Sequence, residues 1–93
     1  MAQIARIFEC KGWTAQDYDR LIDAMDVGGH SAPGVVLHVA GPTADGFRAV
    51  DVYESEEAAD RLAGDMIVPL VAKLGLTAPE VSQFDVHSLL TPA

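Results

Sequence analysis

Residues 35–40 read VVLHVA, residues 47–54 read FRAVDVYE, and the segment between them, residues 41–46, reads GPTADG. Both outer runs are rich in β-branched and aromatic side chains, which favour strands, whereas the segment between them consists of turn formers. Two strands joined by so short a loop most often form an antiparallel hairpin. This hairpin is therefore the centre of the predicted fold.

The segments on either side of the hairpin complete a regular order. A strand is expected from Gln3 to Cys10, and Thr14 begins a capping box at the start of a helix that ends before Gly28. Ser55 caps a second helix, and a last strand is expected from Glu80 to Leu90. The order β-α-β-β-α-β predicts an α+β, ferredoxin-like fold, with a four-stranded antiparallel sheet and two helices on one face.

Both expected helices have an apolar stripe at 3.6-residue periodicity. In the first helix the stripe consists of Tyr18, Leu21, Ile22 and Met25. In the second it consists of Ala59, Leu62, Ala63, Met66, Ile67, Leu70, Val71 and Leu74. Pro69 interrupts the second stripe, which predicts a kink or a break near Val68.

Composition limits the classes of function open to the chain. Its 93 residues make one domain, residues 1–93, and 49% of them are hydrophobic against 22% charged. A net charge of −8 argues against a nucleic-acid partner. Cys10 is the single cysteine, and neither a long apolar run nor a signal-peptide core occurs, so we expect a soluble cytoplasmic protein with no membrane partner.

The sequence contains no recognisable metal or cofactor motif. Its three histidines include no H-x-x-x-H or H-x-H spacing, and Gly28-Gly29 precedes a strand instead of following one and opening a helix. We therefore expect neither a metal nor an organic cofactor.

Strand alternation divides the hairpin into two sets of side chains. The uniformly aliphatic set is predicted to pack under the helices; it consists of Val35, Leu37, Val39, Val50 and Val52. The opposite set is a mixture of apolar and ionisable residues: Val36, His38, Ala40, Phe47, Ala49, Asp51 and Tyr53. So much apolar surface needs cover, and a second copy of the chain, packed sheet face to sheet face, provides it. We thus expect a homodimer through this mixed face, with its polar residues around the cavity that remains.

His38 and Asp51 form the strongest candidate pair on the mixed face. A register that places Ala40 opposite Ala49 also places His38 across from Asp51, and Val36 across from Tyr53. A carboxylate that accepts from one imidazole nitrogen leaves the other nitrogen free to act as a general base. The alternative is that the pair is a structural hydrogen bond that holds two sheets together.

Other residues are candidates for binding a substrate. Tyr53 either donates to a developing oxyanion or fills the barrel, and Arg6 either binds an anionic oxygen or neutralises Asp51. Val36 and Phe47 are expected in the apolar lining, with Phe47 also a candidate for the dimer core.

Two candidates lie outside the hairpin. Trp13 either covers the mouth of the pocket or packs against the first helix, and His87 either contacts substrate or forms a hydrogen bond at the end of the last strand.

Six short motifs are spread along the chain: Arg6-Ile7-Phe8, Gly12-Trp13-Thr14, His38-Val39-Ala40-Gly41-Pro42, Asp45-Gly46-Phe47-Arg48, Asp51-Val52-Tyr53-Glu54-Ser55 and Val86-His87-Ser88-Leu89-Leu90. Together they resemble small actinobacterial proteins of the dimeric α/β-barrel superfamily, and among these the antibiotic biosynthesis monooxygenase group. The resemblance covers essentially the whole chain and implies a homodimer in which each protomer holds a substrate between its sheet and its helices. The superfamily contains cofactor-independent monooxygenases, cyclases, isomerases, haem-degrading enzymes and members without known activity.

The leading hypothesis is therefore a cofactor-independent monooxygenase, or a cyclase or isomerase, that acts on a small apolar, aromatic or polyketide-like molecule. In this hypothesis His38 is the base, Asp51 supports it, and Tyr53 or Arg6 stabilises the oxyanion. The alternatives are a non-catalytic module that binds a small molecule, and a dimeric interaction protein whose barrel is closed by side chains.

Overall fold

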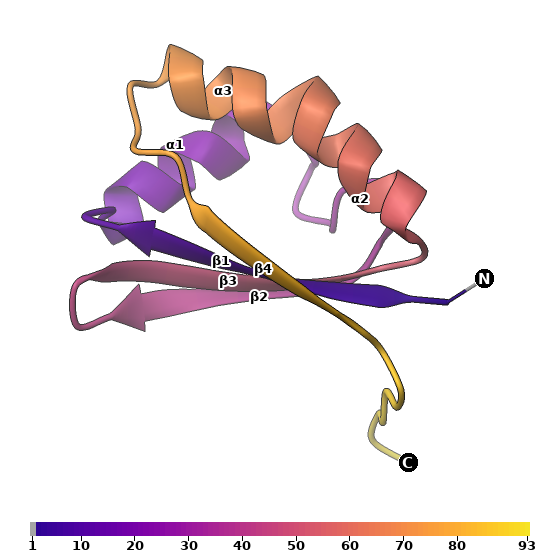
Figure 1. Cartoon of the computed structure of the whole chain (residues 1–93). Coiled ribbons are helices and arrows are strands. Elements are labelled where there is room, and N and C mark those ends of the chain that lie inside the picture. The colour runs from indigo at the N-terminus through magenta and orange to yellow at the C-terminus, as the bar shows by residue number, and fades with distance from the viewer. Residues whose placement is uncertain (1) are drawn as a thin grey trace.

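The computed structural model describes residues 2–93 and confirms the predicted order of strands and helices. The elements are β1 (Ile4–Lys11), α1 (Ala15–Met25), β2 (Val35–Thr43), β3 (Gly46–Tyr53), α2 (Glu56–Leu62), the π-helical turn η1 (Ala63–Ile67), α3 (Val68–Lys73) and β4 (Glu80–Asp85). The four strands form one antiparallel sheet in the order β2-β3-β1-β4. All the helices lie on one side of this sheet, and the other side is open (Figure 1).

The first helix begins and ends through side-chain and backbone caps. Thr14 accepts from the backbone N–H of Asp17, and the Asp17 carboxylate accepts from the N–H of Thr14, which is the predicted capping box. The helix ends earlier than expected, because Asp26 adopts a left-handed conformation and donates its N–H to carbonyls of the last turn. The caps fix the position of α1 over the hairpin.

Pro69 neither breaks nor ends the second helical segment. Residues 56–73 run as α2, η1 and α3 without an interruption, and the N–H of Val68 bonds to the carbonyl of Ala63, five residues back. Proline lacks an N–H and its ring clashes with the carbonyl four residues earlier, and a wider π turn relieves both problems. Ala59, Leu62 and Val71 from the predicted stripe are buried in the core.

The hairpin has the predicted register at its centre. His38 pairs with Asp51, and Ala40 pairs with Ala49. Nearer the start of β2, a bulge inserts Val36, so Val35 is the residue opposite Tyr53. The predicted pairing of Val36 with Tyr53 was therefore wrong by one residue.

The prediction of which hairpin face packs under the helices was also wrong, although Val35 of the aliphatic set is buried in the core. His38, Phe47, Ala49, Asp51 and Tyr53 face the helices, and the last four of these are buried. On the open face, Leu37 and Val39 are 49% and 58% exposed. The helices can cover the mixed face because Tyr18 of α1 supplies a hydrogen-bond partner to His38, so the polar groups of this face are buried with their hydrogen bonds made.

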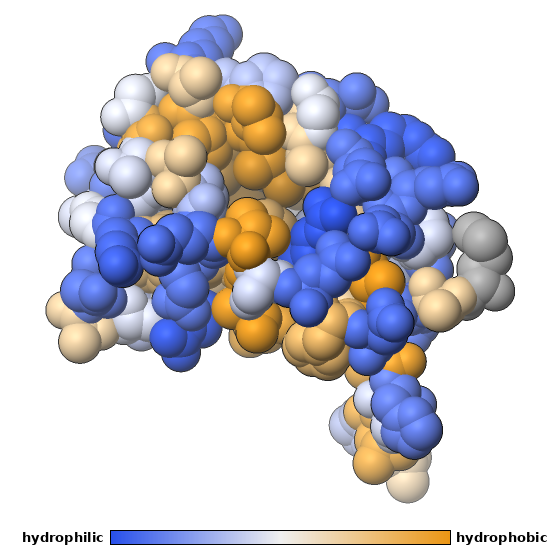
Figure 2. All heavy atoms as spheres, in the orientation of Figure 1, coloured by the Kyte–Doolittle hydropathy of each residue, from blue (hydrophilic) through white to orange (hydrophobic). Residues whose placement is uncertain are grey.

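The end of the chain leaves the sheet sooner than predicted. Strand β4 ends at Asp85 instead of Leu90, and the residues after it form a tail that projects on the open side of the sheet (Figure 1). On the face shown in Figure 2, apolar side chains alternate with hydrophilic ones and gather over the helices, near β4 and on this tail. The exposed apolar residues of β4 and the tail include Val81, Phe84 and Leu90. Within residues 2–93, the helices are all too short or too polar to traverse a bilayer.

Candidate functional site

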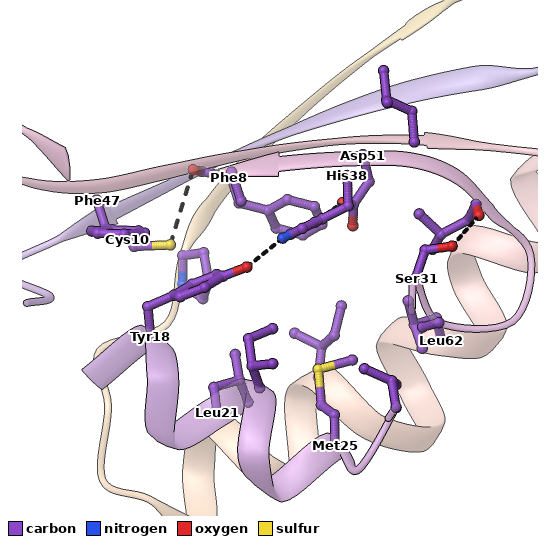
Figure 3. Close-up of a pocket in the computed structure, with 18 of the residues that line it drawn as sticks. Phe8, Cys10, Tyr18, Leu21, Met25, Ser31, His38, Phe47, Asp51 and Leu62 are labelled. Carbon is purple, nitrogen blue, oxygen red and sulfur yellow. Dashed lines mark hydrogen bonds and ion pairs between the residues drawn. The ribbon is translucent and has the colours of Figure 1, made fainter. Parts of the chain in front are cut away.

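A cavity of about 430 Å³ lies between the sheet and the helices. Its walls are mainly apolar and come from β1, β2, β3, α1 and the η1 region, and Leu21 and Met25 of α1 face the sheet across it (Figure 3). The polar groups at the wall are few, and they include His38, Asp51 and Tyr18. A small-molecule site commonly has about 300–1,000 Å³ and a mostly apolar lining with a few polar groups. The cavity therefore has the size and character of a binding site.

Tyr18 of α1 reaches the sheet and contacts His38. Its hydroxyl lies 2.5 Å from His38 Nε2, and its ring is parallel to the imidazole, with 6.0 Å between centroids (Figure 3). The same ring stacks on Phe47 with 4.9 Å between centroids. Stacking on two neighbours restricts the ring, so the hydroxyl is held at the imidazole nitrogen.

Asp51 connects His38 to a buried tyrosine. One of its carboxylate oxygens accepts from His38 Nδ1, and the other accepts from the Tyr53 hydroxyl at 2.7 Å. Asp51 is 5% exposed and Tyr53 is completely buried. The carboxylate is taken out of water, and both of its oxygens are compensated by donors. Tyr18, His38, Asp51 and Tyr53 thus form one hydrogen-bonded chain, which we call the relay.

The relay fixes the protonation pattern of the neutral imidazole. A carboxylate can only accept, so Nδ1 of His38 carries the proton and Nε2 accepts from the Tyr18 hydroxyl. The hydrogen bond to Asp51 raises the pKa of His38 above its ordinary value of 6.5, against the opposing effect of burial.

The two tyrosines of the relay stay protonated near neutral pH. Burial, followed by the charge of Asp51, raises the pKa of Tyr18. Burial raises the pKa of Tyr53 well above its ordinary range, and the hydrogen bond to Asp51 adds to this effect. Both hydroxyls therefore act as hydrogen-bond donors.

The structure brings several of the predicted site residues together. His38, Asp51 and Tyr53 belong to the relay, and Trp13, Val36 and Phe47 line the cavity. Trp13 is buried and donates from its indole nitrogen to the carbonyl of Thr77 at 2.9 Å, so it is a fixed part of the wall.

Arg6 and His87 lie apart from the cavity. Arg6 donates to Asp60 at 2.7 Å and to Gln83 at 3.0 Å, which ties β1 to α2 and β4. His87 follows the end of β4 and is exposed. Neither residue belongs to the cavity wall.

Tyr18 is the site residue that the sequence did not identify. In the sequence it is the first member of an amphipathic stripe, which is typical of core residues. Its hydroxyl gains a partner only when α1 docks over β2. The available signal was a hydroxyl-bearing residue in an otherwise aliphatic stripe, because a buried tyrosine hydroxyl needs a partner.

Cys10 also lines the cavity, but its environment keeps the thiol protonated. Burial, together with the nearby charge of Glu9, raises its pKa to about 11. Within the described residues 2–93, no cluster of three or more His, Cys, Asp or Glu side chains has the geometry to hold a metal ion.

The fold has relatives among solved structures, although no family model and no curated protein sequence matches this chain significantly. A protein of unknown function from Nitrosomonas europaea superimposes with a TM-score of 0.72 at 20% identity, over 100% of this chain and 97% of that one. A proposed antibiotic biosynthesis monooxygenase from Chloroflexus aurantiacus gives 0.66 at 18% identity, over 96% and 97%.

A variant of SnoaB, a cofactor-independent oxygenase from Streptomyces nogalater, gives a TM-score of 0.62 at 19% identity, over 98% of this chain and 97% of that one. The chain therefore has the ferredoxin-like fold of these proteins along its whole length. The resemblance to the antibiotic biosynthesis monooxygenase group is confirmed at the level of the fold.

Proposed function

We propose that this protein is a cofactor-independent enzyme of the monooxygenase or cyclase type that acts on a small apolar or aromatic, polyketide-like molecule. The observation that carries the proposal is the relay, which ends at the wall of an apolar cavity of about 430 Å³. The fold shared with a cofactor-independent oxygenase supports the same reaction class.

The first step is removal of a proton from a phenol or from an enolisable carbon. The substrate gives its proton to the Tyr18 oxygen while Tyr18 gives its own proton to His38 Nε2, because a raised tyrosine pKa disfavours a free tyrosinate. Asp51 then stabilises the imidazolium that forms. The result is a substrate anion in an apolar cavity.

The substrate anion has two productive fates. In oxygenation, an activated methylene group loses two hydrogens to molecular oxygen, with the balance R₂CH₂ + O₂ → R₂C=O + H₂O. In cyclisation, the same carbanion attacks a carbonyl of its own chain, and the proton held on His38 returns to the new alkoxide. Both fates use the same base, so loss of the base abolishes both.

The test uses anthrone in air-saturated buffer as the probe, with oxygen uptake and quinone absorbance as the measurements. Replacement of the base, His38→Ala, should lower kcat by about 10²- to 10⁴-fold. Tyr18→Phe should also lower kcat, and His87→Ala, a change outside the cavity, should retain wild-type activity. If His38→Ala stays within a few-fold of the wild type, the proposed base is wrong.

We also propose a homodimer formed through the open face of the sheet. That face carries exposed aliphatic side chains on the edge strand β2, whereas ion pairs of Arg48 with Glu9 and of Lys11 with Glu80 lie at one end. Apolar surface bordered by charged groups is typical of protein interfaces. The helices already cover the mixed face, which favours the aliphatic face as the surface for a second copy. Native mass spectrometry should give about twice the 9.9 kDa of one chain.

A second candidate function is a carrier that binds the same kind of molecule without changing it. The observation in its favour is that, within residues 2–93, no buried side-chain nitrogen or oxygen lacks a hydrogen-bond partner. A fully satisfied wall suits passive binding. The carrier predicts tight binding of anthrone in air with no oxygen uptake, and a ligand that remains bound in native mass spectrometry.

A further inference from the structure

The cavity wall contains no lysine or arginine. The chain has six basic residues, and none belongs to the described residues that form the wall. Four of them are held by ion pairs elsewhere: Arg6 with Asp60, Lys11 with Glu80, Arg20 with Asp17, and Arg48 with Glu9. Arg61 and Lys73 are exposed on the helices. An anionic group inside the cavity would have no fixed cation to pair with.

The titratable groups at the wall make the site unfavourable for anions. Asp51 is the one carboxylate among the described residues of the wall, and it is buried. When His38 becomes an imidazolium, its charge is already paired with Asp51. His30 is also part of the wall, but it lies on an exposed loop.

The physical cost for a bound carboxylate follows from this arrangement. Moving an ionised carboxylate from water into an apolar cavity costs far more than moving a neutral ester, unless a cation or several donors compensate it. The charge of the buried Asp51 adds repulsion. A neutral aromatic molecule has neither the desolvation penalty of a carboxylate nor the repulsion from Asp51.

We propose that the cavity selects substrates by charge: it takes uncharged aromatic phenols or ketones and rejects the same ring system when it carries a carboxylate. This inference rests on the proposed function, because it takes the cavity as the substrate site. It also defines the preceding step, since a substrate made as a carboxylic acid would have to be decarboxylated or esterified before it reaches this protein.

Three non-reacting ligands test the proposal by isothermal titration calorimetry at pH 7.5. They are 1,8-dihydroxyanthraquinone, its 3-carboxylic acid and the methyl ester of that acid, so the ester matches the acid in size but not in charge. Trp13, the single tryptophan, lies in the cavity wall, and quenching of its fluorescence reports whether binding occurs there. The parent and the ester should bind with similar affinity, and the acid at least tenfold more weakly.

A cation added at the cavity should change this preference. Val36 belongs to the wall but is 44% exposed, so the Val36→Arg guanidinium can stay hydrated at the edge of the cavity. This variant should shift the ratio of acid to ester affinity at least tenfold towards the acid. Val68→Arg makes the same change in net charge at an exposed position of α3 away from the cavity, and its ratio should equal that of the wild type.

The outcomes separate the two proposals. If the acid binds as tightly as the ester, charge selection is wrong, while the proposed function stands. If none of the three ligands binds, or if they bind without quenching Trp13, the cavity is not the site for such molecules, and the charge proposal fails together with the proposed function. If Val36→Arg and Val68→Arg shift the ratio equally, the effect comes from net charge and not from the cavity wall.

Discussion

In the hairpin, the face of the sheet that the helices cover is the more polar one, and the open face is the more aliphatic one, whereas the reverse is usual. The covered face of the hairpin holds a histidine, a buried aspartate and a buried tyrosine, whereas the open face exposes Leu37 and Val39. Burial of polar groups is costly only when they lack partners, and here α1 supplies Tyr18 to the last free nitrogen of the relay. The comparison shows that a polar face can be the inner one when its hydrogen bonds are complete.

The open face has apolar side chains that are exposed to water. Its aliphatic side chains have no polar groups to satisfy, and they need cover from water. We propose that the covered face binds a ligand in its cavity and that the open face packs against a second copy of the chain. If these roles are separate, changes on one face should leave the function of the other intact.

The largest effect is expected from a charge placed on the open face. Val39→Asp would put a carboxylate into the proposed interface, where its desolvation should raise the dimer dissociation constant by roughly a hundredfold or more. Sedimentation velocity measures the change. Val68→Asp introduces the same charge at a similarly exposed position on α3 and should leave the dimer intact. A monomeric wild-type protein would contradict the proposed interface outright.

A smaller effect is expected when the buried carboxylate of the covered face is made neutral. Asp51→Asn keeps the shape but removes the charge that holds His38, and its amide N–H₂ cannot accept from Tyr53 when its oxygen accepts from His38. One donor is left unsatisfied, which should lower the free energy of unfolding by about 1–3 kcal/mol. Urea denaturation measures the loss, and the dimer mass should not change. An unchanged unfolding midpoint would mean that the relay contributes nothing to stability.

Stability and activity should depend on pH in opposite directions, which distinguishes the catalytic role of His38 from its structural role. Since the folded pKa of His38 is raised, the stability from its charged pairing with Asp51 is fully present below pH 6.5 and is lost as pH rises through the folded pKa. A general base must be neutral, so kcat/KM should instead rise over that same interval. Imidazole NMR signals measure the titration directly. In Asp51→Asn the midpoint should move down towards 6.5; a midpoint that does not move would rule out Asp51 as the cause of the raised pKa.

The arrangement of elements was predictable from local signals. The hairpin turn, the capping box at Thr14 and the cap at Ser55 each act within a few residues, and the structure confirms all three. The turn is shorter than predicted, because residues 41–43 and 46 are paired in the strands and only residues 44–45 form the turn. The pairing of His38 with Asp51 followed from the same hairpin geometry. These features depend on backbone chemistry that neighbouring residues determine.

The face of the sheet that packs under the helices was not predictable in this way. Hydrophobicity favoured the aliphatic set, and the contact that the prediction missed joins Tyr18 and His38, which are 20 positions apart in the sequence. The bulge at Val36 shifts the pairing at one end of the strand, and no turn residue marks it in the sequence. Tertiary contacts, not local propensity, therefore selected the inner face.

The smallest effect is expected at the inner end of the relay. Tyr53→Phe removes the hydroxyl that donates to Asp51 at 2.7 Å and keeps the buried ring. The carboxylate then loses one of its two donors but keeps His38, so stability should fall by about 1 kcal/mol. With one competing donor gone, Asp51 pairs more strongly with the imidazolium, and the pKa of His38 should rise a little further.

Because Tyr53 does not line the cavity, its loss should lower kcat less than tenfold, and the rising limb of the pH profile should move to higher pH. This shift distinguishes a residue that positions and tunes Asp51 from one that merely fills space, since a filler would change stability and leave the pH profile alone. A loss of kcat as large as that of His38→Ala would instead mean that Tyr53 contacts the substrate. In that case the catalytic chain would extend across the whole covered face and would not end at the hydroxyl of Tyr18.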